Sequence, residues 1–137
     1  MILAVLAAAS LVHGHPDSLS QSRVRIEGAR ATVELSFQAL SLLEVRPELD
    51  RSGDRLLDAG EAAAARPAVE AYLLDHYRLL RIDGEREEVL AGRLEALEPE
   101  DPGLLGALEL QKVSARLVLE ASNPIEVLEL EVRRFQE

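Results

Sequence analysis

The chain has 137 residues, which is enough for one domain with a hydrophobic core, and 47% of them are apolar. A formal net charge of -10 repels the phosphates of nucleic acids and anionic lipid surfaces, so the composition predicts no nucleic-acid partner. The sequence contains no cysteine and only two phenylalanines and two tyrosines, which excludes disulfides and leaves Leu, Val and Ala to build the core.

The chain begins with an uncharged apolar run at residues 2–12, which has the length of the hydrophobic region of a signal peptide. This run is too short to span a bilayer. Val12 and Gly14 are small enough for the -3 and -1 positions of a cleavage site, although no basic residue precedes the run. We therefore predict a signal peptide at residues 1–14 and an exported chain that begins at His15. The alternative is an N-terminal strand or helix that is buried in the fold.

Residues 22–28 and 31–37 alternate apolar and polar side chains, as half-buried strands do. The short connection between them, at residues 27–30, contains a glycine, so the two runs predict a β-hairpin with one buried face. The period changes to helical spacing at residues 38–49. Pro47 limits regular helix there, so we expect a short helix or a turn.

The strongest helical pattern runs from residue 59 to about residue 78. Its apolar side chains recur at steps of three and four and form one stripe: Ala62, Ala65, Val69, Tyr72, Leu73, His76, Tyr77 and Leu80. Pro67 lies within this pattern and has no backbone N–H. We therefore expect the helix to kink or restart at this residue.

The rest of the chain predicts strands at residues 79–82, 89–97, 107–121 and 125–135, with a hairpin turn at Asp83 and Gly84. In the third of these runs the apolar parity shifts near Gln111, which indicates a bulge or a turn. The whole pattern predicts a mainly β (α+β) fold, an antiparallel β-sandwich of about six strands. Residues 15–137 would form this single domain, with a helical insertion at about residues 40–78.

Residues 50–61 carry acidic side chains at the spacing of an oxygen-rich metal loop. The calcium loop of an EF-hand has twelve residues and takes oxygen ligands from positions 1, 3, 5, 7, 9 and 12. Counted from the first residue, these positions are Asp50, Ser52, Asp54, the carbonyl of Leu56, Asp58 and Glu61. Carboxylates crowded into one turn repel each other until a divalent cation neutralises them. The segment therefore resembles an EF-hand loop, and the resemblance implies Ca²⁺ as the ligand.

Three features of this segment depart from the EF-hand pattern. Position six, where the backbone has positive φ and glycine is usual, is Arg55, which costs on the order of 1 kcal/mol. Pro47 shortens the entering helix, and no second loop has the same spacing. We therefore expect weak, structural calcium binding, of the strength of extracellular modules at about 10⁻⁴ to 10⁻³ M. The alternative is an acidic turn that caps the following helix through Asp58 and holds no metal.

Other candidate chemistry is sparse. As the N-terminal residue after cleavage, His15 would combine an amine with an imidazole, a pair that can chelate copper. His76 lies on the apolar stripe and is expected to be a core or boundary residue. The sequence has no nucleophile elbow, phosphate-binding loop or zinc-protease motif. We therefore predict that the protein is not an enzyme, and keep a hydrolase that uses Asp and Glu as the alternative.

The order of these segments resembles the N-terminal extracytoplasmic region of bacterial membrane proteins of the HupE/UreJ type. The likeness is carried by His15 and Pro16, the hairpin at residues 24–37, the loop at residues 50–61 and the helical run at residues 65–73. The resemblance implies an accessory or sensing domain on the extracytoplasmic side. It also implies a membrane domain as partner, either beyond residue 137 or, for a free-standing version, in another protein.

Overall fold

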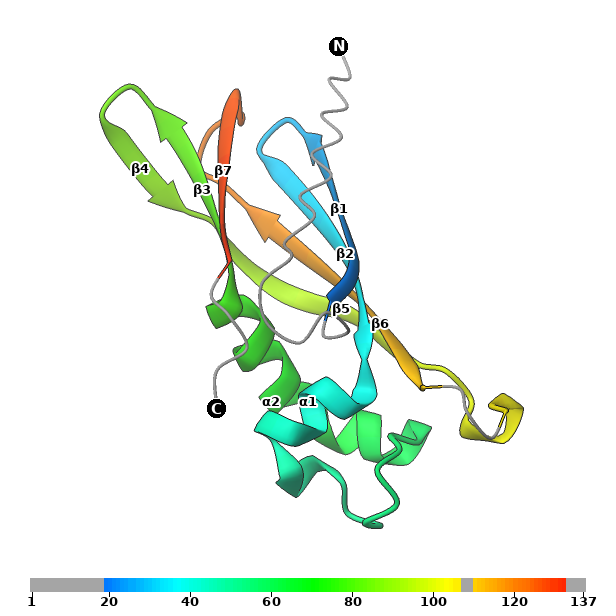
Figure 1. Ribbon diagram of the computed structural model, residues 1–137. Helices are drawn as coiled ribbons and strands as arrows, with labels where there is room; N and C mark the ends of the chain where they lie inside the picture. The colour runs from blue at the N-terminus through cyan, green and yellow to red at the C-terminus, as the bar shows by residue number, and fades with distance from the viewer. Residues whose placement is uncertain (1–18, 107–109, 133–137) are drawn as a thin grey trace.

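The computed structural model describes residues 19–106 and 110–132. The elements along the chain, shown in Figure 1, are β1 (Leu19–Glu27), β2 (Arg30–Gln38), α1 (Ala39–Val45), the 3₁₀ helix η1 (Pro47–Leu49), α2 (Ala59–His76), β3 (Tyr77–Asp83), β4 (Arg86–Val89), β5 (Ala91–Pro99), the 3₁₀ helix η2 (Pro102–Leu104), β6 (Lys112–Glu120) and β7 (Val127–Val132). The predicted signal peptide at residues 1–14 and the candidate copper ligand His15 lie outside the described residues.

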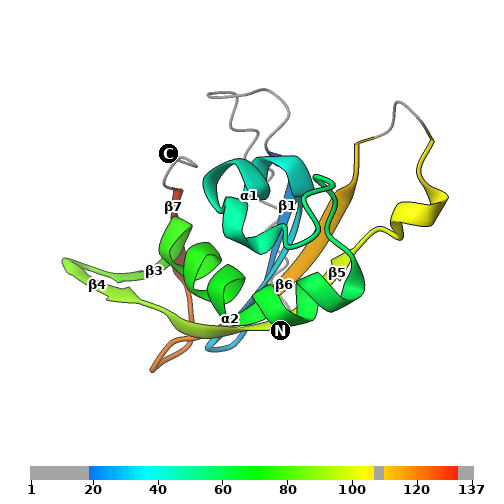
Figure 2. The ribbon, with the colours of Figure 1, turned by 90° about the horizontal axis from the view of Figure 1, so that it is seen from below.

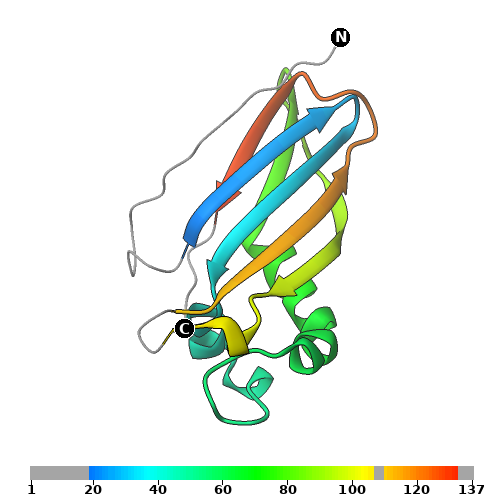
Figure 3. The same cartoon turned by 90° about the vertical axis from the view of Figure 1, so that its right-hand side faces the viewer.

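The strands form two antiparallel sheets. In the larger sheet, which Figure 3 shows face on, the strand order is β1-β2-β6-β5, and the smaller sheet has the order β4-β3-β7. Together with the two α-helices, these sheets confirm the predicted mainly β (α+β) fold class. The described part of the chain contains seven strands, whereas the sequence pattern predicts about six.

The additional strand arises between residues 86 and 99, where the pattern predicts a single strand at residues 89–97. This segment divides into β4, which pairs with β3, and β5, which pairs with β6. Leu90 lies between the two strands, is buried, and donates its backbone N–H to the carbonyl of Leu79 at 2.9 Å. The chain passes from one sheet to the other at this residue. Alternation along the sequence does not reveal such a change of partner.

The core lies between the sheets and the helices and is mainly aliphatic, as the composition predicts. β1 and β2 form the predicted hairpin, and Gly28 in its turn has a φ of +59°, a conformation that favours glycine. Alternate residues of β2 and β6 supply much of the core: Ala31, Val33, Leu35, Phe37, Val113, Ala115, Leu117 and Leu119. β6 starts at Lys112, directly after the residue at which the parity shift predicts a turn or a bulge.

α1, η1 and α2 lie between β2 and β3 in the chain and gather at one end of the strands, as Figures 1 and 2 show. α1 confirms the expected short helix, and Pro47 begins the separate 3₁₀ helix η1. α2 packs along β5. Its buried apolar residues belong to the predicted stripe: Ala62, Ala65, Val69, Tyr72 and Leu73. The insertion therefore positions the acidic loop, residues 50–58, between η1 and α2.

α2 is one continuous helix with Pro67 inside it, so the helix does not restart at this residue. In a regular helix the carbonyl of Ala63 would accept a hydrogen bond from the N–H of residue 67, which proline lacks. Both Ala63 and Pro67 are exposed. Water can solvate that carbonyl, which explains why the helix tolerates the proline. None of the helices in the described ranges is long and apolar enough to cross a membrane.

Candidate metal centre

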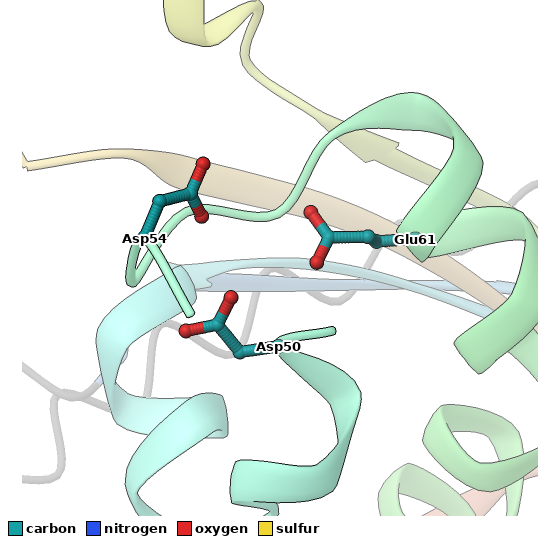
Figure 4. Close-up of side chains that lie close together, drawn as sticks. All are labelled: Asp50, Asp54 and Glu61. Atoms are coloured by element: carbon teal, nitrogen blue, oxygen red, sulfur yellow. The ribbon is translucent and has the colours of Figure 1, made fainter. Parts of the chain in front are cut away.

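Three carboxylates converge in the loop between η1 and α2. Asp50, Asp54 and Glu61 each offer one oxygen atom, and these atoms all lie within 4.8 Å of one another. Figure 4 shows the side chains around one space: Asp50 from the end of η1, Asp54 from the loop and Glu61 from the first turn of α2. Among residues 19–106 and 110–132, no other set of three metal-ligating side chains is as close. Negative charges at this separation repel one another, and a hard divalent cation would relieve the repulsion.

The backbone of the loop is organised around Asp50. Its Oδ1 atom accepts a hydrogen bond from the N–H of Gly53 at 3.0 Å, and its Oδ2 atom accepts one from the N–H of Arg55 at 2.9 Å. Gly53 has a φ of +74° and Arg55 a φ of +61°. Arg55 is the only non-glycine residue in the described ranges with positive φ. Position six of the loop therefore has the left-handed conformation that the EF-hand pattern predicts, with arginine where glycine is favoured.

Asp58 and Glu61 cap the start of α2 reciprocally. The N–H of Glu61 donates to Oδ1 of Asp58 at 2.8 Å, and the N–H of Asp58 donates to Oε1 of Glu61 at 3.2 Å. Glu61 is only 7% exposed, which is unusual for a charged side chain. Its second oxygen, Oε2, accepts a hydrogen bond from the backbone N–H of Ser52 at 3.2 Å. Glu61 thus connects the first half of the loop to the helix that follows it.

Ser52 and Asp54 supply further oxygen atoms to the same space. The hydroxyl oxygen of Ser52 lies 3.4 Å from Oδ1 of Asp50 and 3.4 Å from Oε2 of Glu61. Oδ1 of Asp54 accepts a hydrogen bond from the N–H of Leu56 at 3.0 Å. The nearby Ser52 side chain, and after it the hydrogen bond from the Leu56 N–H, lowers the pKa of Asp54. This exposed carboxylate therefore stays ionised in mild acid.

The six ligands predicted from the sequence fall into two groups. The structure brings Asp50, Asp54 and Glu61 together, with Ser52 against two of them, and places the half-buried Leu56 in the same turn. Asp58 does not belong to the cluster of three carboxylates, and its side chain caps α2. The helix-capping role that the sequence offered as the alternative is confirmed for Asp58.

The sequence does not reveal that Gln111 belongs to the surroundings of the loop. Gln111 is 4% exposed, and its side-chain amide forms hydrogen bonds with the backbone of Leu57 at 2.7 and 2.6 Å, across 54 positions of the chain. The parity shift indicates only a bulge or a turn near this residue, within the strand predicted at residues 107–121. No local pattern identifies its partner, because the contact depends on how β6 packs against the insertion.

A cleft of about 660 Å³ lies beside the loop, between the first turns of α2 and the end of β5. Three carboxylates line it away from the loop: Glu98, Glu100 and Asp101. Glu100 accepts a hydrogen bond from the N–H of Lys112 at 2.7 Å, and Asp101 accepts one from the N–H of Gly103 at 2.9 Å. Both carboxylates therefore accept hydrogen bonds from the backbone beside them. The alternative function, a hydrolase that uses Asp and Glu, stays a prediction.

His76 occupies a boundary position at the end of α2, as its place on the apolar stripe predicts. The side chain is half-buried, and its ring stacks on the ring of Tyr72 with centroids 4.0 Å apart. Its Nδ1 atom lies 2.8 Å from the carbonyl oxygen of Tyr72. Within the described ranges, His76 belongs to no group of three potential metal ligands.

Comparison with known proteins does not assign the chain to a family. No protein-family model, no curated protein and no solved structure matches it significantly. The resemblances to the EF-hand loop and to the HupE/UreJ-type region therefore stay predictions.

Proposed function

We propose that the chain is an exported calcium-binding accessory domain, in which one Ca²⁺ ion stiffens the junction between η1 and α2. The observation that carries the proposal is the convergence of Asp50, Asp54 and Glu61, with ligand oxygens within 4.8 Å of one another. Ca²⁺ takes about six to eight oxygen ligands. In the proposed site, the Ser52 hydroxyl, the Leu56 carbonyl and water complete the ligand set.

The proposed role is structural, because the loop combines features of strong and weak sites. Three carboxylates attract a divalent cation, whereas the strained backbone of Arg55 and the positive charge of its side chain oppose tight binding. An affinity of about 10⁻⁴ to 10⁻³ M suits extracellular calcium concentrations. This expectation agrees with the proposed export, and the proposed partner is a membrane domain or membrane protein on the same side.

Calcium-dependent thermal stability of the full chain tests the proposal. An ion that binds only the folded state stabilises it by about 2.7 kcal/mol at 100 times its Kd, which raises the Tm of a domain of this size by roughly 10 °C. Glu61→Gln keeps an oxygen for the capping bond but loses the charge, so we expect it to remove most of the gain. Glu44→Gln removes a charge from an exposed residue of α1 outside the site and should keep the gain. Identical Tm values of the wild type in calcium and in chelator would refute the metal proposal.

A second candidate function, an interaction domain whose acidic loop holds no metal, is favoured by the hydrogen bonds within the loop. Asp50 and Glu61 each accept two backbone N–H groups, and Asp54 accepts one. Such bonds hold a loop together without a cation. On this alternative, Glu61→Gln lowers the Tm by the same amount in calcium and in chelator.

A further inference from the structure

Both polar atoms of the buried Gln111 side-chain amide form hydrogen bonds within the protein. Its Oε1 atom accepts a hydrogen bond from the backbone N–H of Leu57 at 2.7 Å. Its Nε2 atom donates to the carbonyl of Leu57 at 2.6 Å and to the carbonyl of Glu100 at 2.8 Å. These partners determine the orientation of the amide, because an N–H can only donate and a carbonyl can only accept. The amide therefore joins the acidic loop to the segment that follows β5.

The two bonds between Gln111 and Leu57 have the pattern of paired strands. In an antiparallel pair, two opposed residues exchange both N–H···O bonds, and here one side chain supplies both. Leu57 is fully buried, so its N–H and carbonyl would lack partners without this amide. The backbone carbonyl of Gln111 also accepts a hydrogen bond from the N–H of Ala39, the first residue of α1, at 2.9 Å. Gln111 thus fixes the acidic loop and the start of the preceding helix relative to β6.

Leu57 lies between the last two carboxylates of the candidate site, Asp54 and Glu61. The position of its backbone sets where the chain leaves Asp54 and where it enters the capping box of α2. We propose that Gln111 is a positioning residue for the proposed calcium site. It is not a ligand, and it holds the acidic loop in the conformation in which the carboxylates converge. This inference rests on the proposed calcium function. Removal of a residue that orients metal ligands from outside typically weakens metal affinity by about 10- to 100-fold.

The coupling between the ion and Gln111 is reciprocal. An ion whose affinity depends on the bonds between Leu57 and Gln111 stabilises those bonds by the same factor. Calcium should therefore slow amide hydrogen exchange at Leu57, whose N–H donates to the amide oxygen, and at Ala39, whose N–H donates to the Gln111 carbonyl. The amide of Val33, in the centre of β2 and paired with Leu117, serves as a reference remote from the loop.

The experiment compares the full chain with Gln111→Met and with Val113→Ala. Methionine has a similar length to glutamine but cannot form the three hydrogen bonds. Val113 is fully buried two residues further along the chain, so its truncation destabilises the same region without touching the amide. Calcium Kd by calorimetry and Tm in calcium and in chelator are measured for each protein. We expect Gln111→Met to raise the Kd by about 10- to 100-fold, and Val113→Ala to lower the Tm while its Kd stays within about twofold.

Several outcomes would overturn the inference. If Gln111→Met is less stable but binds calcium as tightly as the wild type, Gln111 has only a structural role and the calcium site stands. If the wild type itself does not bind calcium, the proposed function and this inference both fail. If Gln111→Met does not fold, hydrogen exchange of the wild type decides. Slower exchange at Leu57 and Ala39 in calcium, relative to Val33, supports the inference, and unchanged exchange at both contradicts it.

Discussion

The backbone N–H of Arg55 donates to Oδ2 of Asp50 at 2.9 Å while Arg55 holds a φ of +61°. The carboxylate of Asp50 thus accepts a hydrogen bond from Arg55, whose backbone has a conformation that residues with a Cβ atom disfavour. The strain amounts to about 1 kcal/mol relative to glycine. The hydrogen bonds of the loop therefore hold Arg55 at a positive φ that an arginine disfavours. A substitution by glycine should remove this backbone strain.

We expect Arg55→Gly to stabilise the calcium-free protein and to tighten calcium binding. Glycine adopts positive φ without strain, so the free energy of unfolding should rise by up to about 1 kcal/mol. The substitution also removes a positive charge from a loop that is proposed to hold a cation, which should lower the calcium Kd. Denaturant unfolding in chelator measures the first effect, and calorimetry measures the second.

Arg55→Ala separates the two causes, because alanine removes the charge but keeps the Cβ atom. This variant should show only the part of the fall in calcium Kd that the charge causes, and no gain in the free energy of unfolding. If alanine stabilises the protein as much as glycine does, the positive φ of Arg55 is not the origin of the effect.

Local periodicity predicts the parts of this fold that depend on neighbouring residues. The spacing of apolar residues within short segments predicts the hairpin of β1 and β2, the short helix α1 and the buried stripe of α2. The division at Leu90 does not, because it depends on which strand lies beside each half of the segment. Gln111 escapes prediction for the same reason, since its partner Leu57 is far away in the sequence.

The candidate site was predictable to the extent that its residues lie in one short loop. A twelve-residue register is enough to bring Asp50, Asp54 and Glu61 together. The register alone does not distinguish a ligand from a helix cap, and the same spacing makes Asp58 a candidate for both roles. Only the hydrogen bonds of the folded loop show that its carboxylate is directed at the N–H of Glu61.

Pro67→Ala should stabilise the protein. The proline is exposed in the interior of α2, where it removes the hydrogen bond to the carbonyl of Ala63 and disfavours regular helix. Alanine restores the bond, and the free energy of unfolding should rise by roughly 1 to 3 kcal/mol, reduced by the greater freedom of the unfolded chain. Chemical denaturation measures the change. Since Pro67 lies near the middle of α2 and belongs neither to the acidic loop nor to the capping box, an altered calcium response would contradict a purely helical effect.

Glu88 should contribute stability that depends on pH. Its Oε1 atom accepts a hydrogen bond from Nε of Arg81 at 2.8 Å, and its Oε2 atom accepts one from the N–H of Ser122 at 3.0 Å. The bond from Arg81, and after it the bond from Ser122, lowers the pKa of Glu88 below its usual value of 4.5. A carboxylate with a depressed pKa contributes stability that is complete above its unfolded pKa and is lost as pH falls through its folded pKa.

The comparison of wild type with Glu88→Gln tests this dependence. At neutral pH the wild type should have the higher free energy of unfolding, and the difference should shrink as pH falls below 4.5. Urea unfolding at a series of pH values measures it. A difference that stays constant down to strong acid would show that the charge of Glu88 does not contribute.

Asp58 should stabilise α2 as a cap whether or not calcium is present. Because its Oδ1 atom accepts the N–H of Glu61 at 2.8 Å, Asp58→Ala leaves that donor without its partner and should lower the free energy of unfolding by about 1 kcal/mol. Asp58→Asn keeps an oxygen for the cap and should stay close to the wild type. If Asp58 only caps the helix, both variants retain the full calcium-dependent rise in Tm. A loss of that rise in Asp58→Asn, with the cap intact, would instead make Asp58 a calcium ligand.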